Sequence, residues 1–511
     1  MTAYGQVTIT VNDGGSGTVI TPATAVQAIL GCSSTGTANQ PFATRSLSAL
    51  TSNFGTGPLV EAAAIVILAG GTAIVNKVAQ NSAGTRKAVQ FTGTGSSVIT
   101  SSGNPNDDYY IVFKVVTGGT IGVAGITFQI SLDAGRNFGP IQALGTASSY
   151  LIPSTGVTLN FAAGTLVALD KAQFQTTQPL WATGGIQSAL NALAASSYGT
   201  TGWGSMHIVG GSTSGGVPGA DAATIAGYLE GFAGTPNFIY TDTFMSARDL
   251  NAPTTWGGAG ETEATWISAL QTDYSAVAQK RIVVGAGHWN IPTPYTNVSV
   301  WGAPRYRRPM TWAAAARQVQ IPVQRMLSRV KDGALSNIVV DPTNDPLDGF
   351  VYHDERSNPG LSYLAAGGTG SRFMSTWTRA LRSGVYATQP LTFAALGSDF
   401  NLRPRMAVMN VACSIAAQVG QTQIDDEVRL NANGTINVSD AATISSAIAS
   451  AINNALLATA ALSPPGCKVV VDTTANVGST GIVPITITIY GVGYVLAETI
   501  GIQYSNPNVG S

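Results

Sequence analysis

The last hundred residues carry the pattern that most constrains how this chain can fold. Met406–Val419 is apolar at roughly helical spacing, and Gly420 follows where a helix C-cap belongs. After the tight-turn pair Asn433-Gly434, Ser439–Leu457 forms a second helical pattern, which Ser439 is placed to cap. Apolar residues recur at every fourth position along one face of this second helix: Ile444, Ile448, Ile452 and Leu456. Two helices are therefore expected here.

Extended segments follow the two helical patterns. Pro464–Gly466 is expected to break the chain, and Val469–Val471 predicts a short buried strand. Ile485–Ile489 alternates with period two, which places threonines on one face and isoleucines on the other. The isoleucines of this face are Ile485, Ile487 and Ile489. A last extended run, from Tyr494 to Tyr504, contains Ile500 and Ile502.

The N-terminus carries a strand pattern of its own. Gln6–Asn12 alternates strictly, with Val7, Ile9 and Val11 on one face. Asp13–Gly17 is a flexible, glycine-rich linker. An isolated strand on a flexible linker cannot pair with itself, so it is expected to add to a sheet edge of its own subunit or of a neighbour.

The order helix, helix, strand, strand and extended tail resembles the C-terminal domain of the contractile tail sheath proteins of bacteriophages, the myovirus-type tail sheath family. The N-terminal strand is similar to that family's N-terminal arm. Leu47–Gly71 also resembles the family, with a helix, a Phe-Gly turn, a second helix and a Gly-Gly pair. The resemblance implies that both terminal arms exchange strands with small sheets of neighbouring subunits.

Composition supports a subunit that is covered by copies of itself. Only 10% of the 511 residues are charged, against about 25% in typical soluble domains, while 44% are apolar and 59 are glycine. A lone monomer would need more surface charge for solubility. The net charge of −1 provides no field that attracts nucleic acid or a membrane. No segment has the pattern of a signal peptide or a membrane span.

Changes in the sequence pattern along the chain predict an α/β and α+β multidomain fold. A central α/β core is expected from two segments, in which helical and strand patterns alternate. Its expected strands include Phe238–Thr241 and Asn337–Val340. Between them, short strands at intervals of about ten residues predict an inserted antiparallel β-sandwich or barrel. An α+β assembly domain and a C-terminal arm follow. The expected boundaries are 1–22 (N-terminal arm), 23–84 and 176–402 (core), 85–175 (insert), 403–490 (C-terminal domain) and 491–511 (C-terminal arm).

Within the second core segment, basic and acidic residues are grouped into two separate runs. Lys280–Lys331 holds nine basic residues and no acid, whereas Asp341–Glu355 holds five acids. These blocks are expected to pair within one subunit or across a seam between subunits. The thin interleaving of aromatic residues argues against nucleic acid as the partner of the basic run.

The residues that could serve in catalysis or metal binding match no known catalytic or metal-binding motif. The three histidines, His207, His288 and His353, match no metal motif, and Asp242 at the end of an expected strand has only a position in its favour. We therefore predict no enzyme activity, no metal and no cofactor. Cys32, Cys413 and Cys467 are expected to be buried thiols, with inter-subunit disulfides as the alternative.

The resemblance implies a structural subunit of a contractile phage tail sheath. It implies hexameric rings stacked helically around a tail tube, whose contraction drives the tube through the host envelope. The implied partners are neighbouring sheath subunits, the tube protein, and the baseplate and tail terminator proteins. The implied location is the virion tail, after assembly in the host cytoplasm.

By the same resemblance the C-terminal domain lies innermost, so the candidate tube-facing residues are Asp425, Asp426, Glu427 and Arg429. The candidate inter-subunit residues are those of the two arms and of the alternating strand named above. Two alternatives remain: another self-assembling virion protein, and a secreted β-rich adhesin or glycan-binding protein.

Overall fold

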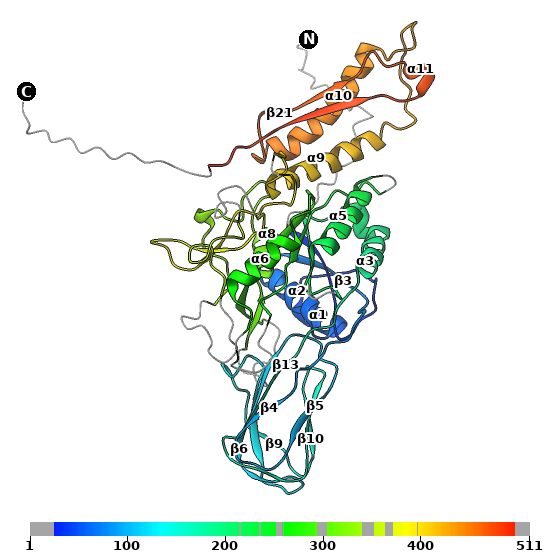
Figure 1. The fold of residues 1–511 in the computed structure, drawn as a ribbon. Helices are drawn as coiled ribbons and strands as arrows, with labels where there is room; N and C mark the ends of the chain where they lie inside the picture. Colours follow the sequence, from blue (N-terminus) through cyan, green and yellow to red (C-terminus); the bar gives the residue numbers. More distant parts are fainter. Residues whose placement is uncertain are drawn as a thin grey trace, which may run out of the picture. The chain divides into compact units, whose positions relative to one another are not determined.

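The computed structural model describes residues 25–213, 216–234, 237–251, 258, 260–293, 304–339, 352–362, 371–395 and 397–495. The chain divides into two compact units, Met1–Thr422 and Gln423–Ser511. The fold is mixed α/β with several separate sheets, as the sequence predicted. Figure 1 gives the course of the chain and the labels used below.

The first unit is built on a six-stranded sheet. Its first five strands run parallel, and the last strand is antiparallel to its neighbour. In spatial order the strands are β16 (Ile282–Gly285), β15 (Thr243–Ser246), β14 (Ser205–Ile208), β1 (Val26–Gly31), β3 (Thr72–Lys77) and β2 (Phe42–Thr44). The four strands β1 and β14–β16 are short and almost fully buried, which is typical of a parallel sheet covered on both faces.

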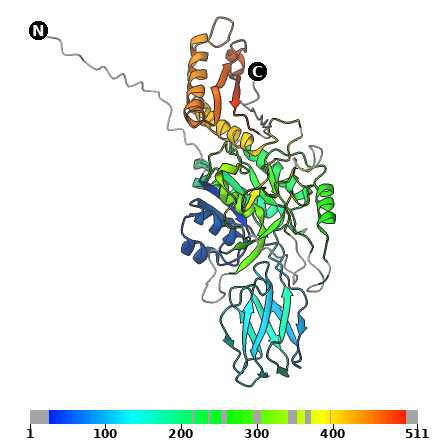
Figure 2. The same cartoon turned by 90° about the vertical axis from the view of Figure 1, so that its left-hand side faces the viewer.

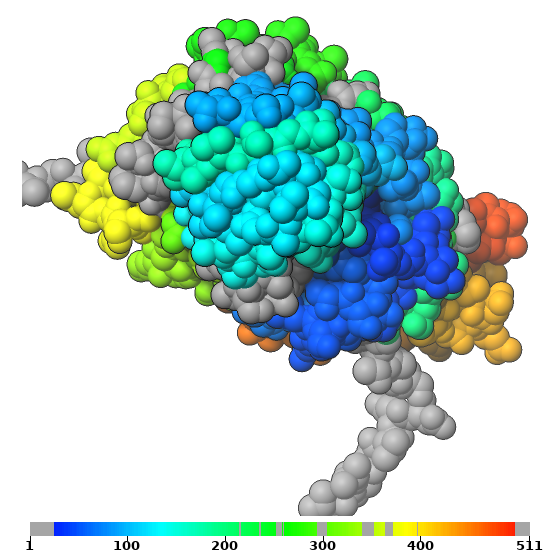
Figure 3. Space-filling model, turned by 90° about the horizontal axis from the view of Figure 1, so that it is seen from below, coloured from blue at the N-terminus to red at the C-terminus, as the bar shows by residue number. Residues whose placement is uncertain are grey.

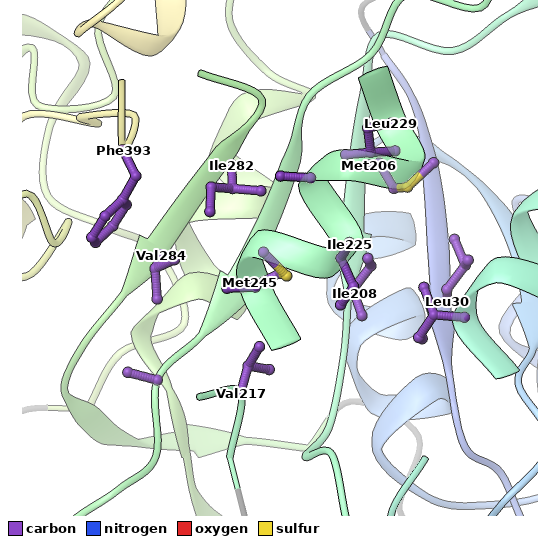
Figure 4. Close-up of a cluster of buried hydrophobic side chains, with 14 of the residues drawn as sticks. Leu30, Met206, Ile208, Val217, Ile225, Leu229, Met245, Ile282, Val284 and Phe393 are labelled. Carbon is purple, nitrogen blue, oxygen red and sulfur yellow. The ribbon is translucent and has the colours of Figure 1, made fainter. Parts of the chain in front are cut away.

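Helices cover both faces of this sheet. One face packs against α3 (Thr183–Ala195), α5 (Gly219–Ala233) and α6 (Glu263–Asp273). Figure 4 shows this contact, in which Ile225 of α5 lies near Ile208 and Leu229 of α5 lies near Met206 of the strands. The other face packs against α1 (Leu47–Phe54), α2 (Pro58–Leu68) and α8 (Met310–Gln318). The short helix α4 (Ser197–Thr201) follows α3.

The helices α2 and α8 are buried almost all round, and their composition allows it. Pro58 begins α2 at the position where a missing N–H costs nothing. Every residue of α8 is buried, and four consecutive alanines, Ala313–Ala316, let the helix lie close to the sheet. Gly285 of β16 is required by this closeness, because a Cβ there would lie 2.2 Å from the Thr311 methyl group.

All strands between β3 and α3 lie outside the central sheet and form a separate β structure. Its core is aromatic and aliphatic, with the Phe113 ring against those of Phe128 and Phe161. Figure 2 shows these strands in cyan, and Figure 3 shows their surface. The strands are β4 (Gln90–Thr92), β5 (Ile99–Gly103), β6 (Tyr110–Thr117), β7 (Gly119–Thr120), β8 (Thr127–Ser131), β9 (Gln142–Ala143), β10 (Ser149–Ile152), β11 (Val157–Phe161), β12 (Thr165–Leu166) and β13 (Lys171–Gln175).

Every strand pair of this insert is antiparallel. The sheet orders are β4-β13-β6-β8-β9, β10-β11-β5 and β12-β7. In the residues that the structure describes, the rest of the first unit contains two small hairpins, one short 3-10 turn and a long helix. These are β17 (His288–Pro292) with β18 (Arg305–Pro309), β19 (Thr376–Thr378) with β20 (Val385–Ala387), η1 (Val330–Asp332) and α9 (Arg403–Gln421).

The second unit combines a helix with one hairpin. The helix α10 (Val438–Ile452) continues into a π-helical turn, η2 (Asn453–Leu457), and packs against β21 (Leu462–Val471). β21 pairs antiparallel with β22 (Ile485–Gly491), and the short helix α11 (Val477–Thr480) lies between them in sequence. The Asn437 side chain caps α10 by accepting from the Ser439 amide, so the cap lies two residues before the predicted one.

Several local predictions differ from the structure. Phe238–Thr241, predicted as a strand, is a loop, because the Ile239 amide bonds back to the Phe232 carbonyl and β15 begins only at Thr243. Pro464–Gly466 does not end the chain's extended course but lies inside β21, where the pairing register shifts between Leu462 and Cys467.

Two further differences concern longer-range packing. The predicted strand Asn337–Val340 is reduced, within the described residues, to one isolated bridge between Val339 and Asn290. The helix that begins at Arg403 belongs to the first unit, so the division falls after Thr422 and not at the predicted boundary of 403. The buried ion pair described below explains this placement.

Candidate functional site

The hairpin of the second unit is the strongest candidate for a functional surface. Among the residues that the structure describes, β21 and β22 pair only with each other, so each strand has an edge whose backbone groups lack a ladder partner. Such an edge is a template for a further strand. A two-stranded sheet is also marginal by itself, and three or more strands are usually needed for stability.

The isoleucines of β22 show which face is incompletely covered. Ile485, Ile487 and Ile489 are half-buried, whereas Thr486 and Thr488 between them are exposed. They pair across the hairpin with Val471, Val469 and Cys467 of β21, and α10 packs against β21. The helix therefore covers the β21 side of the apolar face better than the β22 side. The predicted alternation is present, and a neighbour's strand would bury more of this row.

The predicted arm residues cannot be placed. Val7, Ile9 and Val11 of the N-terminal pattern lie outside the described residues. Ile500 and Ile502 of the C-terminal run also lie outside them. Their role as strands added to a sheet stays a prediction.

The candidate tube-facing segment is exposed. Asp425, Asp426 and Glu427 all lie at the surface, and no ion pair joins them to another residue of the described ranges. Arg429 behaves differently, because its guanidinium pairs with the Asp440 carboxylate and its amide donates to the same group at 2.7 Å. The hydrogen bonds from Arg429 lower the pKa of Asp440. Arg429 therefore holds the loop to the start of α10.

A buried charge cluster joins the inserted β structure to the core of the first unit. The Arg308 guanidinium of β18 lies 2.6 Å from a Glu61 carboxylate oxygen of α2 and 3.1 Å from one of Asp107. It also donates to the Asp108 carbonyl at 2.9 Å. The side chains of Arg308, Glu61 and Asp107 are at most 4% exposed. Two aromatic rings, Tyr109 and Tyr306, meet edge to face beside them at 5.5 Å.

This cluster has more carboxylates than arginines. Burial raises the pKa of Asp108 to about 6, even though Arg308 opposes that shift, and burial also raises the pKa of Asp107. Both Asp108 carboxylate oxygens accept hydrogen bonds from Gln178, at 2.6 Å and 3.0 Å. The cluster therefore ties the segment before β6, and through Gln178 the chain that follows β13, to β18 and α2 of the core.

The neighbouring Arg307 makes a second buried pair. Its guanidinium contacts both Asp249 oxygens, at 2.6 Å and 3.0 Å, and His288 lies 3.3 Å from the same carboxylate. Burial lowers the pKa of His288 to about 4, so the imidazole is neutral near pH 7. The basic run 280–331 thus finds acids from distant segments, such as Glu61, Asp107 and Asp249.

The residues considered for acid–base chemistry are part of the core packing. His353 is fully buried between two carboxylates, with Nδ1 at 2.6 Å from Glu263 and Nε2 at 3.2 Å from Glu355. Burial opposes its charge, but the hydrogen bonds to these carboxylates outweigh that effect and raise the pKa to about 9. Glu355 also accepts from the Leu361 and Ser362 amides. The arrangement fastens the segment around residue 355 to α6.

Asp242 has a structural partner as well. Its carboxylate lies 2.6 Å from Arg403 Nε and accepts from the side-chain amide of Asn410 at 3.1 Å. Arg403 is fully buried, also donates to Gln318 at 2.6 Å, and stacks 4.7 Å from the centre of the Phe244 ring. This ion pair anchors the first turn of α9 in the core, which is why that helix belongs to the first unit.

Metal and thiol chemistry have no visible site. In the described part of the chain, no group of three His, Cys, Asp or Glu side chains is arranged to hold a metal ion. Cys32 and Cys467 are buried, Cys413 is half-buried, and all three are free thiols. Burial raises the pKa of Cys32 to about 12, which makes it a poor nucleophile. No helix in the described ranges is long and apolar enough to cross a membrane.

Comparison with known protein families finds one family that this chain matches. Residues 4–350 match the family described as DUF2586, N-terminal domain. The chain belongs to this family. The match covers most of the first unit of this DUF2586 chain and none of the second unit. No curated protein matches it in sequence.

Several solved structures that resemble this DUF2586 chain are described as sheath proteins. The sheath tail protein of Desulfitobacterium hafniense has a TM-score of 0.44 at 10% identity, over 91% of this chain and 94% of that one. The contracted helical sheath of the anti-feeding prophage has a TM-score of 0.48 at 11% identity, over 99% of both chains. The contracted PVC sheath, from an extracellular contractile injection system, has a TM-score of 0.49 at 10% identity, over 99% of both chains.

Sequence reasoning missed the buried ion pairs of this DUF2586 chain. Arg308 and Glu61 lie 247 positions apart, and Arg403 and Asp242 lie 161 apart, so no local pattern links them. One feature could have pointed to them. Glu61 is the lone acid in an otherwise apolar helix, and a buried acid requires a cationic partner.

Proposed function

We propose that this chain is a structural subunit of a contractile sheath, which polymerises around a tail tube. The observation that carries the proposal is the open hairpin of the second unit, with its half-covered isoleucine row on β22. An incomplete sheet at the surface is built to accept a strand from another chain. The low charge of the chain fits a surface that neighbouring copies cover.

The donor strands in this proposal are the two arms. The N-terminal arm presents Val7, Ile9 and Val11 on one face, with the same period of two as the isoleucines of β22. Ile500 and Ile502 of the C-terminal arm have the same spacing. A strand added in register would place aliphatic side chains beside the isoleucine row and would satisfy the open backbone groups.

In this proposal the subunits form hexameric rings that stack helically, and the arms link them. Backbone hydrogen bonds between strands hold the arms, while the glycine-rich linker Asp13–Gly17 lets the globular parts rotate about them. Contraction then draws its free energy from new packing between the globular parts of neighbouring subunits and needs no nucleotide. The role is structural and not catalytic. The proposed partners are the tail tube, baseplate and terminator proteins, and the proposed location is a phage or phage-like particle assembled in the host cytoplasm.

Deletion of residues 1–14 tests the proposal. The shortened chain is expected to remain soluble and folded, because the deletion leaves intact the central sheet, whose first strand begins at Val26, but it should form no ordered tubes in negative-stain images. A matched pair of full-length variants sharpens the result. Val7→Thr with Ile9→Thr and Val11→Thr should also prevent assembly, whereas Thr8→Ser with Thr10→Ser should assemble normally. Normal sheaths from the shortened chain would overturn the strand-exchange model.

The tube contact is a separate part of the proposal. We assign it to the exposed segment Gln421–Arg429, in which Asp425, Asp426 and Glu427 carry the charge. Residues 405–511 hold three basic and six acidic residues, so we propose either a tube surface with matching basic groups or a contact confined to Arg429 and neutral groups. Exposed ion pairs contribute only about 0–1 kcal/mol each, which suits a contact that must release.

Charge reversal tests the tube contact. Asp425→Lys with Asp426→Lys and Glu427→Lys should weaken polymerisation on isolated tubes at low salt, and added salt should reduce the difference. Asp399→Lys, an exposed reversal in the first unit, serves as the control. Unchanged binding of the triple variant at low salt would show that this segment faces away from the tube.

A further inference from the structure

A hollow of about 280 Å³ lies in the first unit at the edge of the sheet where the strands begin. Its walls come from the turn before β14, from the loop before β15 and from one side of α9. None of the lining residues is charged. The lining residues used here are Gly202, Trp203, Phe238, Tyr240, Ala417 and Gln418.

The chain enters the fold next to this hollow. The Val26 carbonyl, at the start of β1, accepts from the Gly204 amide at 2.9 Å, and Gly204 directly follows the wall residue Trp203. The Ala25 carbonyl bonds to Thr72 on the other side, so the first described residue is already fixed between two strands. Neighbouring strands lie about 4.8 Å apart. The start of β1 is therefore roughly one strand spacing from the wall.

The segment just before β1 matches the hollow in chemistry. Residues 18–24 read Thr-Val-Ile-Thr-Pro-Ala-Thr, which is uncharged like the wall and contains two β-branched aliphatic residues, Val19 and Ile20. Pro22 disfavours a helix and favours extended backbone at the preceding residue, Thr21. Seven extended residues reach at most about 23 Å.

We propose that residues 18–24 of this same chain dock into the hollow, with Val19 and Ile20 against Trp203, Phe238 and Tyr240. These seven residues lie outside the described ranges, and the proposal rests on the hollow, on the point where the chain enters and on the shared lack of charge. The short tether favours a chain's own segment over a neighbour's, because it keeps the local concentration of that segment high.

Docking would shorten the part of the N-terminal arm that is free of the globular fold. The free arm would end at about residue 17 instead of residue 24, and it would leave the fold beside α9. A pull on the arm would then act on α9, the helix that ends the first unit at the point where the chain continues into the second. This inference does not depend on sheath assembly, so it is tested on the dilute, unassembled chain.

Hydrogen exchange of the full-length chain gives the first test. Val19→Asp with Ile20→Asp would bring charge into an uncharged hollow, and the amides of residues 414–421 and 237–240 should exchange severalfold faster than in the unsubstituted chain. The matched control is Val7→Asp with Ile9→Asp, which puts the same charge on the distal arm and should leave these amides unchanged. Equal exchange in both variants would overturn the proposal.

Disulfide trapping gives the second test. Ile20→Cys with Ala417→Cys should form a bond under mild oxidation, located by peptide mapping, whereas Ile9→Cys with Ala417→Cys should not. Mixing isotopically labelled and unlabelled chains tells bonds within a chain from bonds between chains. Bonds within one chain support the proposal. Bonds only between chains, or equal trapping of both pairs, would overturn it, and neither result would bear on whether the chain forms a sheath.

Discussion

At the scale of single residues, the chain uses its few charges inside the fold. Arg308, Arg403 and His353 are each buried against carboxylates, although charged residues make up only 10% of the sequence. Removing one partner of such a pair leaves an uncompensated buried charge, which typically costs about 3–5 kcal/mol. These residues therefore matter for folding, and the residues considered for catalysis, His353 and Asp242, have structural roles of this kind.

The titration of His353 gives a prediction with a definite sign. Burial lowers its pKa, but hydrogen bonds to Glu263 and Glu355 outweigh burial and raise the pKa from the usual value near 6.5 to about 9. A raised pKa means that the folded state holds this proton more tightly than the unfolded state does. The stabilisation is complete below about pH 6.5 and is lost as the pH rises to about 9. The loss is about 3 kcal/mol.

Thermal unfolding of the wild type and of His353→Gln between pH 6 and pH 10 checks this prediction. The variant has no charge to lose, so it should be less stable than the wild type at pH 6, and the two should converge towards pH 9. Subtracting one curve from the other removes the titration of lysines and tyrosines elsewhere. A difference that stays constant over this range would show that His353 is neutral in the fold.

At the scale of elements, β22 is a strand whose two faces have different roles. Ile485, Ile487 and Ile489 are half-buried and Thr486 and Thr488 are exposed, so the unit folds with this apolar row only partly covered. One hydrophobic cluster of the second unit includes the buried residues Ile436, Ala441 and Val471, and Ile485 of the row is only partly buried against it. A further strand would therefore add burial that the unit lacks by itself.

Replacing the three isoleucines by threonine should separate folding from assembly. Because each side chain is only half-buried, the isolated subunit should lose little stability, about 1 kcal/mol or less for each residue. Sheath assembly, measured by sedimentation, should be lost, while circular dichroism of the subunit should be unchanged. Thr486→Ser with Thr488→Ser, on the other face, is the control. Assembly of the triple variant at the wild-type level would exclude this row from the interface.

At the scale of the whole first unit, one arginine joins two substructures. Arg308 contacts Glu61 of the core and Asp107 of the insert, and beside it Tyr306 packs with Tyr109. The insert leaves the core after β3 and returns before α3, so its attachment depends on contacts at its base. A buried cluster with an excess of carboxylates is sensitive both to the cation and to pH.

Arg308→Met should loosen this attachment at neutral pH. Three carboxyl groups would then share a buried site without a cation, and the cost should be about 3–5 kcal/mol. The pKa of Asp108 is already raised to about 6 by burial, and loss of Arg308 should raise it further. A raised carboxyl pKa favours the folded state as the pH falls, so the variant should regain stability at pH 5 relative to pH 7.5.

Thermal unfolding and limited proteolysis at the two pH values measure this effect. Arg45→Met, at an exposed position, is the matched control and should behave like the wild type. The Arg308 variant should be cut faster near residues 84–108 at pH 7.5 and should be protected again at pH 5. Equal stability of the two variants at pH 7.5 would show that Arg308 does not hold the insert.

The sequence by itself determined the local elements. The periodicity of Met406–Val419 and Ser439–Leu457 predicted two helices, and the alternation of Ile485–Ile489 predicted the strand with its two faces. Strand and helix alternation also predicted the mixed α/β class. These features depend on residues within a few positions of one another, because backbone propensity and side-chain periodicity are local.

Only the tertiary structure decided which distant groups meet. It set the strand order, paired Arg308 with Glu61 and Arg403 with Asp242, and so kept α9 in the first unit. It also turned Phe238–Thr241 into a loop and drew Pro464–Gly466 into β21. A buried charge or a strand edge is satisfied by whichever group the fold brings within about 3 Å, and that group can lie hundreds of residues away.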